Sequence, residues 1–266
     1  MTDRLQITRE RAIGHTVAAF KQFCSALRAV TDLSAVAVGS WTVQDVAGHL
    51  NGSFDLYPDM LLGKSSPLAS PQEITAFNDK VVAGETRSVP ELADAIEARV
   101  DDFVDSATRA GDEPHAWHAG IELPVETFCA VLIGEALVHG YDVAQAESRP
   151  WRIDPAAVRT AFIGLLPLLP HYVDERAATG VEARFELKLR GEDGARAFLF
   201  FDDGRLAIEE PAAGVLDCHV SADPVAFMLV SYGRAGLVRP VLTGKMLAWG
   251  RKPWLSFKIP SLLRSP

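Results

Sequence analysis

Hydrophobic residues in the first half of the chain recur at spacings of three and four, the period of an α-helix with one buried face. Thr42 and Asp45 have the spacing of a capping box, which marks the start of one such helix. Four amphipathic helices over residues 1–150 predict an all-α four-helix bundle. The predicted helices cover residues 9–30, a segment that opens at Trp41, residues 90–111 and residues 124–146.

The pattern changes after residue 150. A helix interrupted by prolines is predicted from Asp154 to about Ala178, after which the hydrophobic period falls to two. Phe185, Leu187 and Leu189 alternate with polar neighbours, and further short strands follow around turns such as GEDG and DDG. We expect antiparallel strands with helices at their ends, which predicts an α+β domain over residues 151–266.

Composition favours a soluble protein of the cytoplasm. The chain is 48% hydrophobic and 23% charged, a normal balance for a globular protein. The N-terminal segment has scattered charges and no apolar stretch, so no signal peptide is expected. The most apolar run, 161–170, is short and contains Pro167, so we expect no membrane partner. The three cysteines show no CxxC pairing and fit a reducing compartment.

Charge is distributed unevenly. The net charge of −9 argues against nucleic acid as a partner. Residues 1–150 hold 11 basic and 22 acidic residues, residues 151–266 hold 15 and 13, and no acidic residue follows Asp223. This basic tail is either a solvated or docking face, or a site for an anionic small molecule. Arg251, between Trp249 and Trp254, is our candidate catalytic residue for holding a planar anion.

Three residues have the chemistry of a metal site. Glu135 and His139 are four apart in a predicted helix, so their side chains point within roughly 40° of each other. Glu135 lies on the apolar face, where an unpaired carboxylate is costly, and His49 is similarly placed in its own helix. Two imidazoles and one carboxylate suit zinc and leave a fourth position open. Taken singly, His49 also fits a hydrogen-bonded core histidine, and Glu135 half of a buried ion pair.

Two segments, WTVQDVAGHLNG and GEALVHGYDVAQA, resemble the signature segments of the DinB-like bundle in mycothiol-dependent maleylpyruvate isomerases. The stretches DCHVSADPVAFMLVSYGR and LTGKMLAWGRKPW resemble the sterol-carrier-protein-like domain that follows that bundle in the same family. The resemblance implies that His49, Glu135 and His139 bind zinc. It also implies mycothiol as a thiol cosubstrate.

Other polar residues are candidates for supporting roles. Asp45 could orient the ring of His49, as ligand histidines usually require, or it could cap its helix. Asp142, three residues after His139, could accept a hydrogen bond from that ring or belong to an ion pair. His115, Trp117 and His118 could line the rim of the metal pocket or serve only in packing.

These features lead to one hypothesis and two alternatives. We expect a zinc-dependent enzyme that activates a low-molecular-weight thiol for attack on an electrophilic small molecule, as an isomerase of the maleylpyruvate type or a thiol transferase. Arginine outnumbers lysine 19 to 7, which fits the GC-rich actinobacteria that make mycothiol. A metal-dependent hydrolase, or a non-catalytic protein that binds a lipid or another small molecule, remains the alternative.

Overall fold

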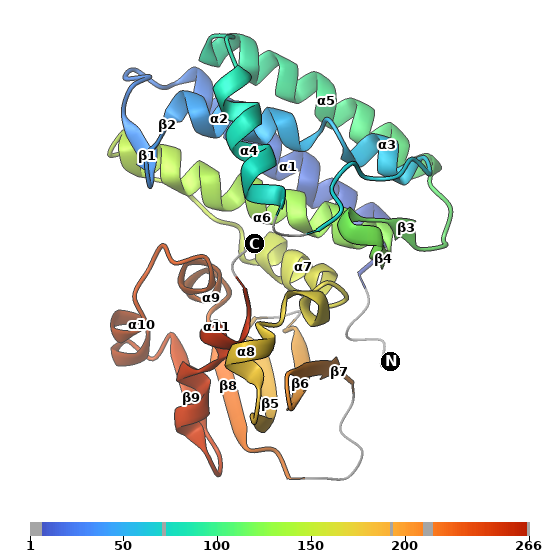
Figure 1. The fold of residues 1–266 in the computed structure, drawn as a ribbon. Coiled ribbons are helices and arrows are strands. Elements are labelled where there is room, and N and C mark those ends of the chain that lie inside the picture. Colours follow the sequence, from blue (N-terminus) through green and yellow to red (C-terminus); the bar gives the residue numbers. More distant parts are fainter. Residues whose placement is uncertain (1–6, 71–72, 192–193, 210–214, 265–266) are drawn as a thin grey trace. The chain divides into compact units, whose positions relative to one another are not determined.

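The computed structural model describes residues 7–70, 73–191, 194–209 and 215–264 (Figure 1). The chain divides into two compact units, one of Thr8–Ile153 and one containing Asp154–Pro266. The first is helical and the second combines helices with a five-stranded sheet. The prediction of a helical domain followed by an α+β domain is therefore confirmed.

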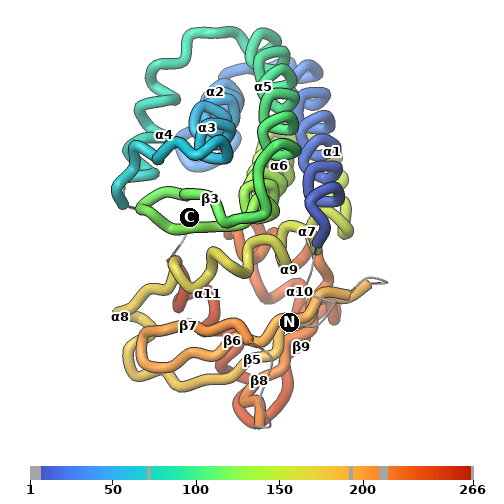
Figure 2. The backbone as a smooth tube through the Cα atoms, turned by 90° about the vertical axis from the view of Figure 1, so that its right-hand side faces the viewer, coloured from blue at the N-terminus to red at the C-terminus, as the bar shows by residue number. Residues whose placement is uncertain are grey.

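The helical unit is built mainly from three helices of 20, 21 and 22 residues and two shorter ones of 11 and 12 residues. Its elements are α1 (Arg9–Arg28), β1 (Val36–Val38), β2 (Trp41–Thr42), α2 (Val43–Ser53), α3 (Tyr57–Leu61), α4 (Glu73–Gly84), α5 (Val89–Arg109), β3 (His115–Ala116), β4 (Glu122–Leu123) and α6 (Val125–Ala146). Helix α1 packs against α5 and α6, and α2 packs against α4, α5 and α6. Figure 2 shows α1 and α6 side by side. Between these helices lies an apolar core that contains Phe20, Phe23, Phe103, Phe128 and Leu132.

Two short hairpins in this unit were not predicted. Strand β1 pairs antiparallel with β2, and β3 pairs antiparallel with β4. Gly39 lies in the turn of the first hairpin with a φ of 58°, a left-handed conformation that glycine adopts without strain. Strands of two or three residues are too short to establish a period of two, so hydrophobic pattern could not reveal them.

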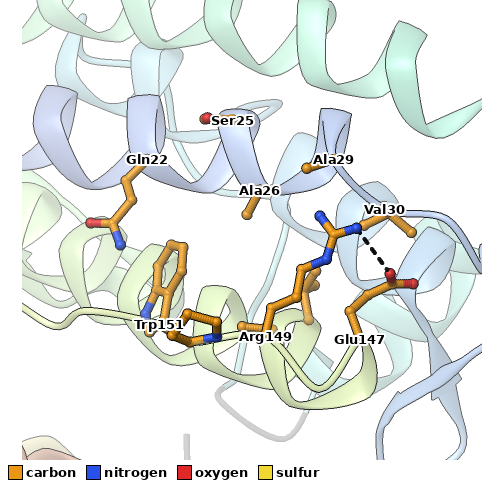
Figure 3. A pocket seen from close by; sticks show the side chains of 11 residues that line it. Gln22, Ser25, Ala26, Ala29, Val30, Glu147, Arg149 and Trp151 are labelled. Atoms are coloured by element: carbon orange, nitrogen blue, oxygen red, sulfur yellow. Dashed lines mark ion pairs between the residues drawn. The ribbon is translucent and has the colours of Figure 1, made fainter.

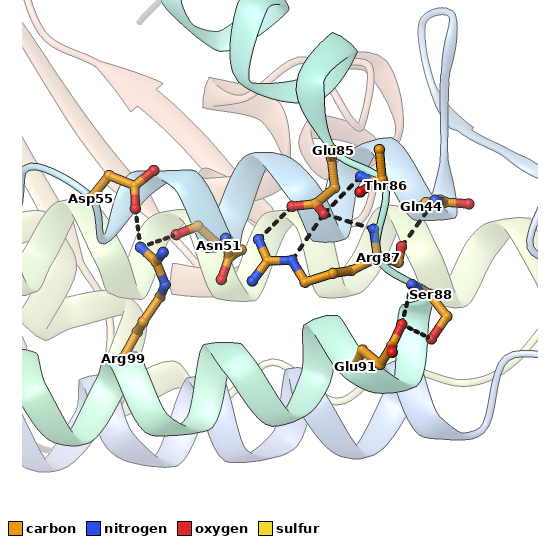
Figure 4. A network of polar contacts seen from close by, with 9 residues as sticks. All are labelled: Gln44, Asn51, Asp55, Glu85, Thr86, Arg87, Ser88, Glu91 and Arg99. Atoms are coloured by element: carbon orange, nitrogen blue, oxygen red, sulfur yellow. Dashed lines mark hydrogen bonds and ion pairs between the residues drawn. The ribbon is translucent and has the colours of Figure 1, made fainter.

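A polar network fastens α2 to the segment that leads into α5 (Figure 4). The Glu85 carboxylate accepts hydrogen bonds from the Arg87 side chain at 2.9 and 2.6 Å, and the Arg87 carbonyl accepts one from Gln44 at 3.0 Å. The bond to Arg87 holds the pKa of Glu85 below its usual range. At the other end of α2, Arg99 of α5 pairs with Asp55. Because both ends are tied, α2 has a defined position relative to α5.

The α+β unit contains one mixed sheet with strand order β7-β6-β5-β8-β9. The pairing of β5 with β8 is parallel, and the other three pairings are antiparallel. Its elements are α7 (Pro155–Leu165), α8 (Glu175–Ala178), β5 (Glu182–Leu189), β6 (Arg196–Asp202), β7 (Arg205–Ile208), β8 (Cys218–Ala222), α9 (Pro224–Ser231), α10 (Val238–Leu242), β9 (Met246–Trp249) and α11 (Ile259–Leu262), with short 3₁₀ turns at Leu169–Tyr172 and Pro253–Phe257.

Three details of the sequence prediction change. The expectation of purely antiparallel strands is wrong, since the chain crosses from β7 to the far side of β5 before it forms β8. The single helix expected from Asp154 is broken into α7, a 3₁₀ turn and α8, because Pro167 and Pro170 cannot continue a helix. Part of the GEDG turn, residues 192–193, lies outside the described residues.

Helix α6 is the single described helix that is long and apolar enough to cross a bilayer by length and composition. However, 83% of its apolar window is buried inside the protein, as in the core helix of a folded domain. Its apolar character is therefore accounted for by packing against α1, α2 and the β1 strand.

Candidate metal centre

His49, Glu135 and His139 meet inside the helical unit, between α2 and α6. The Glu135 Oε2 atom lies 3.0 Å from His49 Nε2 and 3.3 Å from His139 Nε2. One ligand atom from each of the three residues lies within 4.8 Å of the other two. Both histidines are buried, whereas the Glu135 side chain is 22% exposed. The cluster is thus closed by protein around the two imidazoles and open to solvent at the carboxylate.

Local sequence explains how the three side chains converge. Residues 135 and 139 are one turn apart on α6 and share a face. Gly48 and Gly52 of α2 lie where Glu85 and Val81 of α4 pass, so these glycines leave room for α4 and the Glu85 segment to pack on α2. His49 then lies on the side of α2 that meets α6.

The donor set fits a divalent metal ion. Two imidazole nitrogens and a carboxylate oxygen are the ligands that zinc takes at sites with an open position. The second ring nitrogen of His139, Nδ1, lies 3.1 Å from Asp142 Oδ2. An ionised carboxylate only accepts hydrogen bonds, so Nδ1 carries the proton and the ring is oriented with Nε2 toward Glu135. Asp142 therefore supports the arrangement that metal binding requires.

The pKa shifts of Glu135 and His139 in the metal-free cluster also fit a site for a cation. Burial alone would raise the pKa of Glu135, but hydrogen bonds from His139 and His49 outweigh burial and hold this pKa well below its usual range. Burial alone would lower the pKa of His139, but its bonds to Asp142 and Glu135 raise it to about 9. The cluster therefore holds a buried negative oxygen that is neutralised by a proton on His139. A metal cation could take the place of that proton.

No hydrogen bond joins Asp45 to His49 among the described residues. The Oδ2 atom of Asp45 accepts hydrogen bonds from the backbone N and the hydroxyl of Thr42, both at 2.8 Å, which completes a capping box at the start of α2. Of the two roles considered for Asp45, the structure assigns helix capping. The Nδ1 atom of His49 is buried and has no hydrogen-bond partner among the described residues.

Trp41 is the neighbour that sequence reasoning overlooked. Its indole ring lies 5.0 Å from the ring of His49 and 6.4 Å from that of His139, centroid to centroid. The residue lies on β2, two residues before α2 begins. Its place at the start of the WTVQDVAGHL segment was a signal, although spacing alone does not show toward which side the ring points.

Arg251 belongs to the other compact unit. It lies in the exposed turn that follows β9, between Trp249 and Trp254, which are 49% and 59% exposed. Its assignment as a catalytic residue stays a prediction.

His118 and Trp117 are buried in an aromatic cluster with Tyr57 and Phe128. The Ser66 hydroxyl lies 2.7 Å from His118 Nδ1, and burial lowers the pKa of His118 to about 4. His118 is therefore neutral and serves in packing. Among the described residues, neither makes a ring contact with the histidines of the metal cluster, and His115 is half-buried on β3 with its Nε2 3.3 Å from the Gly111 carbonyl.

A separate groove lies where the C-terminal half of α1 passes the end of α6 (Figure 3). It is lined by small apolar residues of α1 together with Val143, Ala144 and Trp151. Its Glu147 carboxylate already accepts hydrogen bonds from Thr31 and Asp32. The groove includes none of the three metal-cluster residues and has no comparable donor set.

The sequence of the helical unit that holds this site matches a known protein domain. The sequence profile of the mycothiol maleylpyruvate isomerase N-terminal domain matches residues 14–144, which include all three cluster residues. No curated protein sequence matches the chain significantly.

Among solved structures, the crystal structure of a mycothiol-dependent maleylpyruvate isomerase is similar with a TM-score of 0.56 at 14% identity, over 88% of this chain and 93% of that one. A variant of the mycothiol-dependent maleylpyruvate isomerase, with one histidine changed to alanine, gives a TM-score of 0.58 at 14% identity, over 93% and 95%. These likenesses show a shared fold. Residues 14–144 therefore form a mycothiol maleylpyruvate isomerase N-terminal domain.

Proposed function

We propose that this protein is a mycothiol-dependent enzyme that holds one divalent metal ion, zinc in the first instance, with His49, Glu135 and His139. The observation that carries the proposal is the convergence of two imidazole Nε2 atoms on one carboxylate oxygen, with a ligand atom of each residue within 4.8 Å of the others. The solved relatives are named for mycothiol-dependent maleylpyruvate isomerase chemistry. We further infer that α1, α2, α5 and α6 form a DinB-type four-helix bundle and that the α+β unit is sterol-carrier-like.

A zinc ion at this site would supply a positive charge that favours the thiolate form of a thiol at neutral pH. The residues of the chain have separate tasks. Asp142 holds the Nδ1 proton of His139, so that Nε2 of this ring is available as a ligand. Trp41 and the packing of α2 against α6 exclude water from one side of the cluster. The exposed part of Glu135 marks the side from which small molecules approach.

The reaction class follows from a thiol nucleophile. Addition of the thiolate sulfur to an electron-poor double bond forms a C–S bond, rotation follows, and elimination of the same thiol returns the isomerised product. With an electrophile that carries a leaving group, the C–S bond remains and the product is a thioether. We propose the isomerase of the maleylpyruvate type or a thiol transferase, with Arg251 as the candidate residue for holding an anionic substrate.

Metal content is the first test. Plasma mass spectrometry on the purified wild type should find about one zinc per chain, and the Glu135→Ala/His139→Ala double variant should have lost it. Turnover of maleylpyruvate should then require both the metal and added mycothiol. A wild type that binds no divalent metal would overturn the proposal, and metal-dependent turnover without any thiol would favour a hydrolase instead.

A further inference from the structure

The two histidines of the cluster are held in place by different means. The ring of His139 has a polar partner on each side, a hydrogen bond between Nδ1 and Asp142 and an ion-pair contact of 3.3 Å between Nε2 and Glu135. The ring of His49 makes only one polar contact, its Nε2 to Glu135, and its buried Nδ1 has no partner among the described residues. A ligand imidazole usually needs a second contact to fix its orientation. For His49, that contact must be something other than a hydrogen bond.

The indole of Trp41 supplies such a contact. Its ring centroid lies 5.0 Å from that of His49, with the two planes inclined by 46°. This separation is within the range in which aromatic rings attract and restrict each other. Trp41 also lies 6.4 Å from the ring of His139, so it covers one side of both imidazoles.

The backbone at Trp41 is itself well anchored. Trp41 pairs with Val38 across the β1–β2 hairpin. The next residue, Thr42, is the N-cap of α2, and its capping box with Asp45 fixes the angle at which the chain enters the helix. The ring of Trp41 therefore approaches His49 from a rigid support rather than from a loose loop.

We propose that Trp41 is a positioning residue, which holds the imidazole of His49 by ring contact in the orientation that a metal ligand requires. The inference rests on the proposed metal site and adds a residue to it. Without the indole, the His49 ring can rotate about its Cβ–Cγ bond and point Nε2 away from the cluster. Metal would then be held by Glu135 and His139 with an imperfectly oriented third ligand.

The test compares three variants in their affinity for zinc, measured by competition with a chromogenic chelator. Trp41→Leu removes the aromatic ring and should weaken zinc affinity by about tenfold, the lower end of what loss of an orienting partner costs. Trp41→Phe keeps a ring and should stay within about threefold of the wild type. Trp254→Leu, an exposed tryptophan of the other compact unit, is the matched control and should leave zinc affinity unchanged.

Cobalt provides readouts that a purely structural role would not move. The visible absorption of the Co²⁺-loaded protein reports ligand geometry, and it should change in Trp41→Leu but not in Trp41→Phe. Co²⁺ should also quench tryptophan fluorescence in the wild type more than in Trp41→Phe, because the indole lies beside both imidazoles. This second measurement does not depend on the folding of the leucine variant.

The possible outcomes distinguish a failure of the role inferred for Trp41 from a failure of the proposed metal site. Unchanged zinc affinity and an unchanged Co²⁺ spectrum in a folded Trp41→Leu protein would overturn the role of Trp41 and leave the metal site standing. Equal quenching in the wild type and Trp41→Phe would also overturn it. Absence of metal from the wild type would overturn both.

Discussion

The Nδ1 atom of His139 lies 3.1 Å from Oδ2 of Asp142, three residues further along the same helix. Asp142 is almost fully buried, so its carboxylate has little contact with water. The pair thus fixes both the tautomer and the direction of the His139 ring from within α6. Any metal held by His139 is supported by this second residue, although Asp142 is not itself among the candidate ligands.

Replacement of Asp142 by asparagine should weaken zinc affinity by about 10- to 100-fold. Asparagine can still accept a hydrogen bond from Nδ1, but it lacks the charge that raises the pKa of His139 and the basicity of its ring. The Kd for zinc, measured by chelator competition, checks this. Asp101→Asn, an exposed position on α5, is the control and should behave as the wild type.

Glu135→Gln should abolish stable metal binding, since a neutral amide is a poor ligand for zinc and leaves two imidazoles alone. Metal content after dialysis should fall from about one ion per chain to a trace. Glu126→Gln is a close control, because Glu126 is on the same helix and its side chain is 23% exposed against 22% for Glu135. Retention of zinc by the Glu135 variant would remove Glu135 from the ligand set.

The metal-free protein should lose stability on both sides of a window of pH. The folded-state pKa of His139 is raised from 6.5 to about 9, so its contribution is complete below pH 6.5 and is lost as pH rises toward 9. The pKa of Glu135 is lowered, so its contribution is present above pH 4.5 and is lost as pH falls. The alkaline loss amounts to at most about 3 kcal/mol.

Urea unfolding of chelator-treated protein between pH 5 and 9.5 measures this loss. His139→Gln should remove the alkaline decline, because its neutral side chain does not titrate. Zinc affinity should rise over the same interval, since the metal competes with the proton on His139. A decline of equal size in the glutamine variant would assign it to other groups.

Asp45→Ala should separate capping from ligand support. Loss of the capping box is expected to cost about 1 kcal/mol of unfolding free energy, visible as a lower Tm. Zinc affinity should fall far less than in Asp142→Asn, because the hydrogen bonds of Asp45 go to Thr42 and none goes to His49. Equal losses of affinity in the two variants would show that Asp45 supports the ligand directly.

Gly140→Val should destabilise the helical unit. A side chain at position 140 would overlap the ring of Trp151, which packs against α6 and donates a hydrogen bond to the Leu137 carbonyl. Overpacking of this kind costs about 1–3 kcal/mol, which thermal unfolding can resolve. Gly14→Ala on α1, where no atom lies within 4 Å of the added carbon, should instead be neutral or slightly stabilising.

Local pattern was sufficient for the long helices, and with the family resemblance of two segments it singled out His49, Glu135 and His139, which the structure brings together. The spacing of Glu135 and His139, together with a buried carboxylate on an apolar face, depends only on helix geometry and desolvation. The same geometry predicted the capping pair Thr42 and Asp45. Information of this kind lies within a few residues of the chain, so it can be read before the fold is known.

Sequence by itself therefore determined the long helices α1, α5 and α6, the start of α2 and the period-two strands, and it singled out the three residues proposed to bind metal. Only tertiary structure decided that Asp142 holds His139, that Trp41 faces His49, and that β8 pairs parallel with β5. Each of these depends on which elements meet in space and on the direction of a side chain between them. The packed structure settles both the direction of a side chain and the partner of a strand, and the period of the hydrophobic pattern carries no record of either.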